Sequence, residues 1–182
     1  MPADQATCTA TVVERTPDAV VVSNLGVASY VLAGVADRDR NFYLWGSMGS
    51  TTATGVGVAH GTSEQVTVLA GDGSLTMSLG VLSTVATADQ PNLTVVCFDN
   101  GIYGTTGGQP TPEIDFTAAA EAQGLPATSV ETNEAFADAY DDAVARDGPS
   151  LIECSVEPTG PDSRPTFDYP QIPRRVRDSL TE

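Results

Sequence analysis

Residues 71–104 read GDGSLTMSLGVLSTVATADQPNLTVVCFDNGIYG, and this stretch decides the fold class. The run just before it, Val66–Ala70, is apolar and stops at a glycine, which is typical of a buried parallel strand. Leu93–Phe98, near its other end, has the same character. Between the two strands lie apolar residues at helical spacing, and Ser74 is the expected N-cap of a single helix. The stretch therefore predicts a parallel strand–helix–strand unit.

Two polar residues follow these strands. Asp72 comes directly after the first strand, and Asn100 comes after the second. A right-handed crossover places the ends of both strands at one edge of the sheet, where open α/β sheets bind ligands. Carboxylate and amide oxygens suit a hard divalent cation that holds a phosphate. The sequence therefore predicts a metal–phosphate site at this edge.

The rest of the chain indicates one α/β domain. Alternating strands and helices predict a doubly wound, mostly parallel sheet with helices on both faces, which is a three-layer αβα architecture. Strands are expected at 19–22, 42–45, 127–130 and 150–156, and helices at 27–36, 116–123 and 133–146, the last capped by Asn133. Residues 51–60 are small and are expected to pack closely against a sheet or a cofactor. We expect the domain to cover residues 1–157 and an irregular tail to cover 158–182, with a final turn at 174–180.

The composition is strongly acidic. Lys plus Arg number 8 against 24 Asp plus Glu, all eight cations are arginine, and the net charge is −16. This charge argues against nucleic acid and anionic membranes as partners. The lack of lysine favours adaptation to high salt (a halophilic protein), where screening removes the self-repulsion. A generically acidic protein is the alternative.

Three cysteines, Cys8, Cys97 and Cys154, show no metal-binding spacing, and the last two lie in apolar runs. They are expected to be buried thiols in a reducing compartment. No apolar run reaches membrane-spanning length and no signal-like segment opens the sequence, so a cytoplasmic protein is expected. The single histidine, His60, argues against a Ser-His-Asp or His-metal site within this chain.

The glycine–aspartate–glycine turn and the loop at 99–104 resemble a known motif. GDG followed after this spacing by DNGIYG is similar to the metal–diphosphate motif of thiamine diphosphate enzymes, which commonly have asparagine where this chain has Asp99. The resemblance implies Mg²⁺ held by Asp72, Asn100 and the backbone carbonyl of Ile102, with diphosphate oxygens completing the shell. The cofactor-binding residues that it implies here are Gly71, Asp72, Gly73, Ser74, Asn100, Ile102, Tyr103 and Gly104. No Lys or Arg lies between Arg40 and Arg146, so metal and backbone N–H groups must neutralise a diphosphate.

A second resemblance lies upstream, in the loop Gly46-Ser47-Met48-Gly49. In thiamine diphosphate decarboxylases, a large apolar residue in this loop lies under the cofactor and bends it. The bend brings the aminopyrimidine nitrogen to the thiazolium carbon that it deprotonates. The resemblance implies this supporting role for Met48, and pyrimidine contacts through backbone groups of Gly46 and Met48. A loop methionine that packs into the core is the alternative.

The longer match is narrower. NFYLWGSMG, GDGSLTMSLGVLSTVA and DNGIYGTTGGQPT together resemble the diphosphate-binding half of sulfopyruvate and phosphonopyruvate decarboxylases, over about Val20–Val156. In the sulfopyruvate enzyme this half is a separate β subunit. Those relatives usually carry Ser-Arg-Glu where this chain has Ser29-Tyr30-Val31, and several carry histidine at the position of Ser50. Both differences remove ionisable groups, so the class of 2-oxo acid (sulfonate, phosphonate or carboxylate) stays open.

The resemblance implies decarboxylation of a small 2-oxo acid, with the cofactor supplying the covalent chemistry. Enzymes of this kind need a glutamate from a separate pyrimidine-binding domain. This chain is filled by the diphosphate motif, so we expect an α partner chain that supplies the glutamate. An orphan domain with no activity of its own is the alternative. Thr105, Thr106 and Gln109 are candidate substrate-facing donors, or an ordinary polar loop.

Two alternatives remain. One is another thiamine diphosphate enzyme subunit, such as an acetolactate synthase-like carboligase, because the partner's pocket would decide the fate of the intermediate. The other is a non-catalytic metal- or phosphate-binding regulatory module with Asp99 at a strand end. That class expects an acidic pair after the first strand and a late lysine, whereas this chain has Ser23-Asn24 and no lysine.

Overall fold

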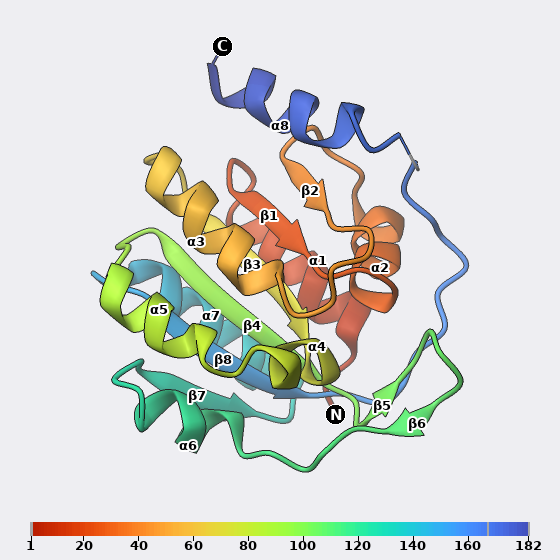
Figure 1. The fold of residues 1–182 in the computed structure, drawn as a ribbon, viewed down its shortest axis with the longest axis vertical. Coiled ribbons are helices and arrows are strands. Elements are labelled where there is room, and N and C mark those ends of the chain that lie inside the picture. Colours follow the sequence, from red (N-terminus) through yellow and green to blue (C-terminus); the bar gives the residue numbers. More distant parts are fainter. Residues whose placement is uncertain (1, 167, 182) are drawn as a thin grey trace.

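The computed structural model describes residues 2–166 and 168–181 and shows three layers, helices–sheet–helices (Figure 1). The middle layer is a six-stranded sheet in the order β2-β1-β3-β4-β8-β7, with every neighbouring pair parallel. The strands are β1 (Val20–Ser23), β2 (Asn41–Tyr43), β3 (Val66–Gly71), β4 (Leu93–Asp99), β7 (Ala127–Val130) and β8 (Ser150–Ser155). The predicted doubly wound α/β class is confirmed.

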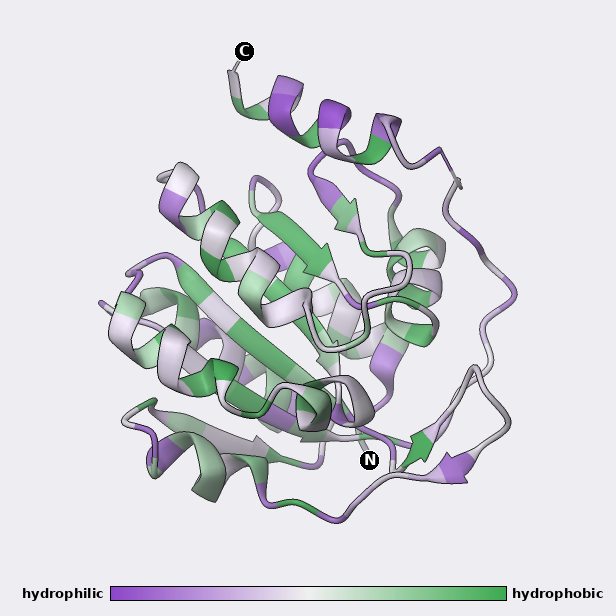
Figure 2. Cartoon of the chain, in the orientation of Figure 1, coloured by the Kyte–Doolittle hydropathy of each residue, from purple (hydrophilic) through white to green (hydrophobic). Residues whose placement is uncertain are grey.

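The helices divide between the two faces of the sheet. One face packs against α1 (Gln5–Arg15), α2 (Val27–Val35) and α7 (Asn133–Ala145). The other packs against α3 (Thr51–Gly61), α4 (Asp72–Met77), α5 (Val81–Ala88) and α6 (Phe116–Glu121). Successive side chains of a strand alternate between these faces, so Leu69 joins one core and Val68 the other. Strands β3 and β4 are consequently mostly apolar (Figure 2), and each also carries one buried threonine, Thr67 and Thr94.

Close packing of α3 on the sheet confirms the expectation for the small-residue stretch. A Cβ added to Gly55 would lie 2.1 Å from Cγ2 of Val68 on β3. Only a glycine allows this approach of helix and strand, because atoms at that distance overlap. The sheet, not a cofactor, is therefore the partner of this face of α3.

The strand register places the two motif loops together. Gly71 at the end of β3 pairs with Phe98 on β4. The residues that follow each of them, Asp72 and Asp99-Asn100, therefore leave the sheet side by side at its carboxyl edge. The prediction that Asp72 and Asn100 lie at the same edge of the sheet is therefore confirmed.

The single helix expected after Gly71 is two helices, and its expected cap is wrong. α4 and α5 are separated by a turn at Ser78, whose hydroxyl donates to the carbonyl of Gly49 at 2.6 Å. Gly71 occupies the N-cap position of α4. Ser74 lies inside the helix, and its hydroxyl accepts a hydrogen bond from the backbone N–H of Gly49 at 2.9 Å. A contact with a distant loop has replaced the local capping bond.

The cap predicted for α7 is displaced by one residue. The hydroxyl of Thr132 accepts from the N–H of Ala135 and is the N-cap. Asn133 is the first helical residue, and its side-chain oxygen accepts from the N–H of Asp4 at 2.8 Å. Asn133 therefore joins α7 to the start of α1.

Two terminal helices differ from expectation. The sequence predicts no element before residue 19, yet α1 forms there with Asp4 as N-cap. The helix has a buried face that contains Cys8 and Val12, but the threonines between the apolar residues make this face hard to recognise in the sequence. At the other end, the expected turn is a full helix, α8 (Gln171–Thr181), which packs beside β2 (Figure 1). Whether 158–182 counts as a separate tail stays a prediction.

Within residues 2–166 and 168–181, no helix has both the length and the apolar character needed to cross a membrane.

Candidate functional site

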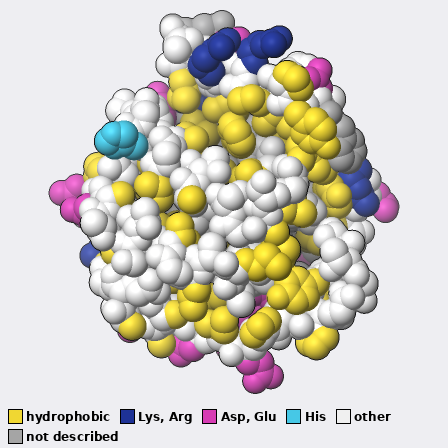
Figure 3. Space-filling model, in the orientation of Figure 1, with side chains coloured by type: hydrophobic (Ala, Val, Ile, Leu, Met, Phe, Trp, Pro, Cys, Tyr) yellow, Lys and Arg dark blue, Asp and Glu magenta, His cyan; other side chains and the backbone are white. Residues whose placement is uncertain are grey.

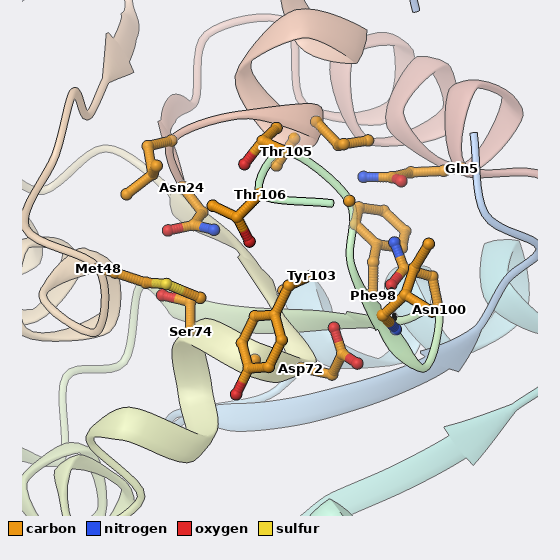
Figure 4. A pocket seen from close by; sticks show the side chains of 17 residues that line it. Gln5, Asn24, Met48, Asp72, Ser74, Phe98, Asn100, Tyr103, Thr105 and Thr106 are labelled. Atoms are coloured by element: carbon orange, nitrogen blue, oxygen red, sulfur yellow. Dashed lines mark hydrogen bonds between the residues drawn. The ribbon is translucent and has the colours of Figure 1, made fainter. Parts of the chain in front are cut away.

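A cavity opens at the carboxyl edge of β3 and β4, beside α4 (Figure 4). It contains about 620 Å³ of empty space when its open mouth is included. Its walls are Gln5, Asn24, Leu25, Val27, Ala28, Met48, Gly71, Asp72, Gly73, Ser74, Phe98, Asn100, Ile102, Tyr103, Gly104, Thr105 and Thr106. The structure thus brings the predicted cofactor-binding residues together at one cavity, except Gly46 and Ser47.

Asp72 is the charged group of the cavity wall. Its side chain is 3 % exposed, and Thr111 donates a hydrogen bond of 2.6 Å to its Oδ2. Burial raises the pKa of this carboxyl, and nearby Asp99 raises it further, against the opposing hydrogen bonds from Thr111 and the N–H of Gly73. No ion pair to either carboxylate occurs within residues 2–166 and 168–181. The site therefore holds a desolvated negative charge that a cation would stabilise.

The loop after β4 folds back on itself through side-chain-to-backbone bonds. Asn100 Oδ1 accepts from the N–H of Ile102 at 3.0 Å, and Asp99 Oδ1 accepts from the N–H of Gly101 at 3.1 Å. The turn leads into β5 (Ile102–Tyr103), which pairs with β6 (Gln109–Pro110). This turn brings both Asn100 and Ile102 to the cavity wall that contains Asp72.

Gly73 must lack a side chain because of Tyr103. A Cβ at Gly73 would lie 2.4 Å from Cε1 of the tyrosine ring. The ring thus packs directly on the backbone of α4, next to Asp72. This contact fixes the β5 segment against the start of the helix and leaves backbone, instead of side chain, at this part of the wall.

The loop at 46–49 reaches the cavity through Met48. Figure 4 shows this side chain next to Ser74, pointing into the cavity. Gly49 has φ +93°, a left-handed conformation that favours glycine. Gly46 and Ser47 are not among the residues of the cavity wall.

The candidate substrate-facing residues separate into two groups. Thr105 and Thr106 line the cavity. Gln109 does not, and its amide instead donates to the carbonyl of Thr106 at 3.0 Å, so it braces the loop. His60 is exposed on α3 and has no part in the cavity.

Two polar wall residues escaped the sequence-based prediction. Asn24 follows β1 directly, and its Oδ1 accepts from the hydroxyl of Thr51 at 3.0 Å. It carries the same signal that identified Asp72 and Asn100, a polar residue immediately after a buried strand. Gln5 carries no such signal, because α1 is remote in sequence from the motif loops.

The metal ligands present here are few. Within residues 2–166 and 168–181, no group of three or more His, Cys, Asp or Glu is arranged to hold a metal ion. Asp72, Asn100 and the carbonyl of Ile102 offer one carboxylate, one amide and one backbone oxygen. Mg²⁺ keeps six oxygen ligands and is commonly bound through a few protein groups plus substrate phosphates. The donor set fits a cation whose shell is completed by a phosphorylated ligand.

Comparisons with known proteins agree with this chemistry. Residues 25–154 match the family described as thiamine pyrophosphate enzyme, C-terminal TPP binding domain. Phosphonopyruvate decarboxylase of Streptomyces viridochromogenes is 40 % identical over 169 residues, which cover 90 % of this chain and 43 % of that protein. Sulfopyruvate decarboxylase subunit beta of Methanothermobacter thermautotrophicus is 40 % identical over 149 residues, covering 80 % of this chain and 77 % of that subunit.

A solved structure shows the same fold. The thiamine diphosphate-dependent 4-hydroxybenzoylformate decarboxylase of Rhodococcus jostii RHA1 superimposes with a TM-score of 0.75 at 27 % identity, over 86 % of this chain and 33 % of that one. The chain spans less than half the length of the phosphonopyruvate decarboxylases that it matches, 43 % in both cases. Since the family match covers most of the chain, the protein belongs to the thiamine pyrophosphate enzymes, as their C-terminal TPP-binding domain.

Proposed function

We propose that this chain is the diphosphate-binding subunit of a thiamine diphosphate- and Mg²⁺-dependent decarboxylase of small 2-oxo acids. The observation that carries the proposal is the buried carboxylate of Asp72, without an ion-pair partner among the described residues, in one cavity wall with Asn100 and Ile102. The relatives that are named phosphonopyruvate and sulfopyruvate decarboxylase support the reaction class.

The residues of the cavity wall would bind different parts of the metal–cofactor complex. Asp72, Asn100 and the carbonyl of Ile102 would hold the cation. The backbone and hydroxyl groups that would receive the diphosphate are Gly71, Gly73, Ser74, Tyr103 and Gly104. Once bound, the cofactor supplies the carbanion chemistry of decarboxylation. The protein's contribution is placement and charge stabilisation.

The loop at 46–49 would receive the pyrimidine end. Met48 presents an unbranched thioether that adapts to the surface it supports. Gly46 and Ser47 would offer backbone groups at the pyrimidine edge. Gly49 donates a hydrogen bond to Ser74 and accepts one from Ser78, and these two bonds hold the loop on α4 and its following turn, so the two ends of the proposed cofactor site share one support.

An α subunit with a pyrimidine-binding domain is the proposed partner, and it would supply the glutamate that the reaction needs. Relatives from three organisms that are named sulfopyruvate decarboxylase subunit beta support a second chain. Met48, in the cavity wall, is 36 % exposed, and Met77, at the end of α4, is 60 % exposed. Figure 3 shows the face of the molecule that is turned toward the viewer in Figure 1. Hydrophobic and uncharged side chains cover its middle, and acidic side chains lie mostly around its rim. Such a face suits a protein partner.

The class of 2-oxo acid stays open. Among the described residues that line the cavity, none is Arg, Lys or His. A sulfonate or phosphonate group would therefore need its cationic partner from the α subunit. A carboligase would use the same half-site, and decarboxylation is preferred because the relatives above are named decarboxylases. A regulatory module receives no support from the family match.

The proposed enzyme is cytoplasmic and adapted to high salt. The three cysteines are buried and unpaired, which supports a reducing compartment. The charge of −16 without lysine supports the salt adaptation.

The test is co-purification in high salt with the product of the neighbouring gene, followed by calorimetric titration of thiamine diphosphate with and without Mg²⁺. Cofactor binding should require Mg²⁺ and should be lost in Asp72→Ala. Asp138→Ala, on the solvent side of α7, is the matched control and should bind normally. A complex that fails to bind the cofactor, or an Asp72→Ala complex that binds it normally, contradicts the proposal. Release of CO₂ from sulfopyruvate, phosphonopyruvate or pyruvate then identifies the substrate class.

A further inference from the structure

Gln5, at the start of α1, is a buried polar side chain aimed into the cavity. It is 3 % exposed and forms part of the cavity wall. Its Oε1 has no hydrogen-bond partner among residues 2–166 and 168–181. Figure 4 shows its amide pointing from α1 toward the cavity, on the side of Asn100 and Phe98.

The position of Gln5 is fixed by backbone bonds to the strand ends. Ala3 bridges to Val156, and the N–H of Val156 donates to the carbonyl of Asp99 at 2.9 Å. The N–H of Ala3 donates to the carbonyl of Glu131 at 2.8 Å. The start of α1 is therefore anchored beside the loop that carries Asn100. These bonds place Gln5 on the side of the cavity where Asn100 lies, which is the proposed metal–diphosphate end.

An unpartnered buried amide is unfavourable unless a ligand or water satisfies it. The desolvation of such a group costs on the order of 1–3 kcal/mol. Thr9, one turn along α1, provides a comparison within the same helix. It is fully buried and its Oγ1 also lacks a partner among the described residues, but it does not line the cavity. Within the described ranges, 2–166 and 168–181, Gln5 alone combines an unpartnered buried polar atom with a place in the cavity wall.

We propose that Gln5 is an additional ligand-binding residue, whose Nε2 donates to an oxygen of the bound diphosphate and whose Oε1 accepts from a water of the cation. The inference rests on the proposed function. A neutral amide suits this place because it offers a donor and an acceptor at once. The cavity wall has no cationic side chain among its described residues, so neutral donors must satisfy the diphosphate oxygens.

The experiment is calorimetric titration of the complex described above with two probes, Mg²⁺ plus thiamine diphosphate and Mg²⁺ plus inorganic pyrophosphate. Gln5→Leu should weaken binding of both probes roughly tenfold or more, the usual loss for a hydrogen bond to a charged group. Gln5→Glu should bind both more weakly still, because a carboxylate repels the diphosphate. Thr9→Val is the matched control and should bind both probes like the wild type. Thermal unfolding without ligand should show that the Gln5→Leu fold is intact.

The outcomes separate the two proposals. If the wild type binds both probes and Gln5→Leu binds them as tightly, the role of Gln5 is wrong and the proposed function stands. If Gln5→Leu weakens thiamine diphosphate alone, the amide faces another part of the cofactor, which also overturns the inference. If the wild type binds neither probe, the proposed function fails first.

Discussion

The hydroxyl of Ser74 accepts a hydrogen bond of 2.9 Å from the backbone N–H of Gly49, 25 residues earlier in the chain. The carbonyl of the same Gly49 accepts from the hydroxyl of Ser78 at 2.6 Å. Both backbone groups of one residue are thus bound to α4 and the turn that ends it. This arrangement joins the loop of Met48 to the helix that begins with Asp72.

Ser74→Ala tests that connection. The variant leaves the N–H of Gly49 without its acceptor, so we expect the free energy of unfolding to fall by about 1–2 kcal/mol. Cofactor affinity should fall as well, because the loop of Met48 is no longer held and the hydroxyl proposed to receive the diphosphate is gone. Urea unfolding and calorimetry measure the two effects. Ser83→Ala, an exposed serine on α5, is the control, and equal behaviour of the two variants would contradict the connection.

Asp72→Asn should change stability and binding in opposite directions. The pKa of Asp72 is raised mainly by burial, so its contribution to stability is present below the unfolded pKa, near 3.8, and is lost as pH rises through the folded pKa. At pH 7 without metal, the neutral amide should therefore make the fold more stable, by about 1 kcal/mol. Affinity for thiamine diphosphate with Mg²⁺ should be lost.

Urea unfolding of both proteins in EDTA, from pH 7 down to pH values below the unfolded pKa of Asp72, checks this prediction. The stability difference should shrink toward acid, where the wild-type carboxyl is protonated in both states. A less stable Asp72→Asn protein at pH 7 would contradict it.

Gly73→Ala should disturb the site through Tyr103. The new methyl group would lie 2.4 Å from the tyrosine ring, so the ring or α4 must move. We expect a loss of about 1–3 kcal/mol in the free energy of unfolding, together with weaker cofactor binding. Gly80→Ala is the control, because no atom lies within 4 Å of its added Cβ. Equal stability of both variants would show that the ring moves freely.

Alkaline stability should depend on Tyr43. Burial raises the pKa of its phenol to about 12, and its hydroxyl donates to Asp37 at 3.0 Å. Since the folded pKa lies above the ordinary value of 10, stability is lost as pH rises from 10 toward 12, when the phenol ionises only in the unfolded chain. Between pH 10 and 12, the free energy of unfolding should therefore fall by about 1–2 kcal/mol less in Tyr43→Phe than in the wild type. Urea unfolding across this pH range measures it, and an unchanged slope would refute it.

Salt should stabilise the fold. A net charge of −16 repels itself in the compact state, and screening weakens that repulsion. The thermal midpoint should therefore rise between about 0.1 M and about 2 M KCl, over the range in which the Debye length shortens to a few ångströms. An unchanged or falling midpoint would contradict salt adaptation.

The sequence by itself determined the layers, the parallel sheet and the edge that holds the site. Buried strands such as Val66–Gly71 carry apolar residues on both faces, and this pattern and the glycine that ends the strand are local properties of the chain. The order of strand, helix and strand then allows one crossover hand, which brings Asp72 and Asn100 to one edge.

Only the tertiary structure decided which partner each polar group chose. Ser74 and Asn133 have the chemistry of helix caps, yet each bonds to a segment far away in sequence, Gly49 and Asp4. A cap prediction compares local partners alone, whereas the folded chain offers distant backbone groups as well. Gln5 reaches the cavity for the same reason, because α1 is anchored to the ends of strands that are formed more than 90 residues later.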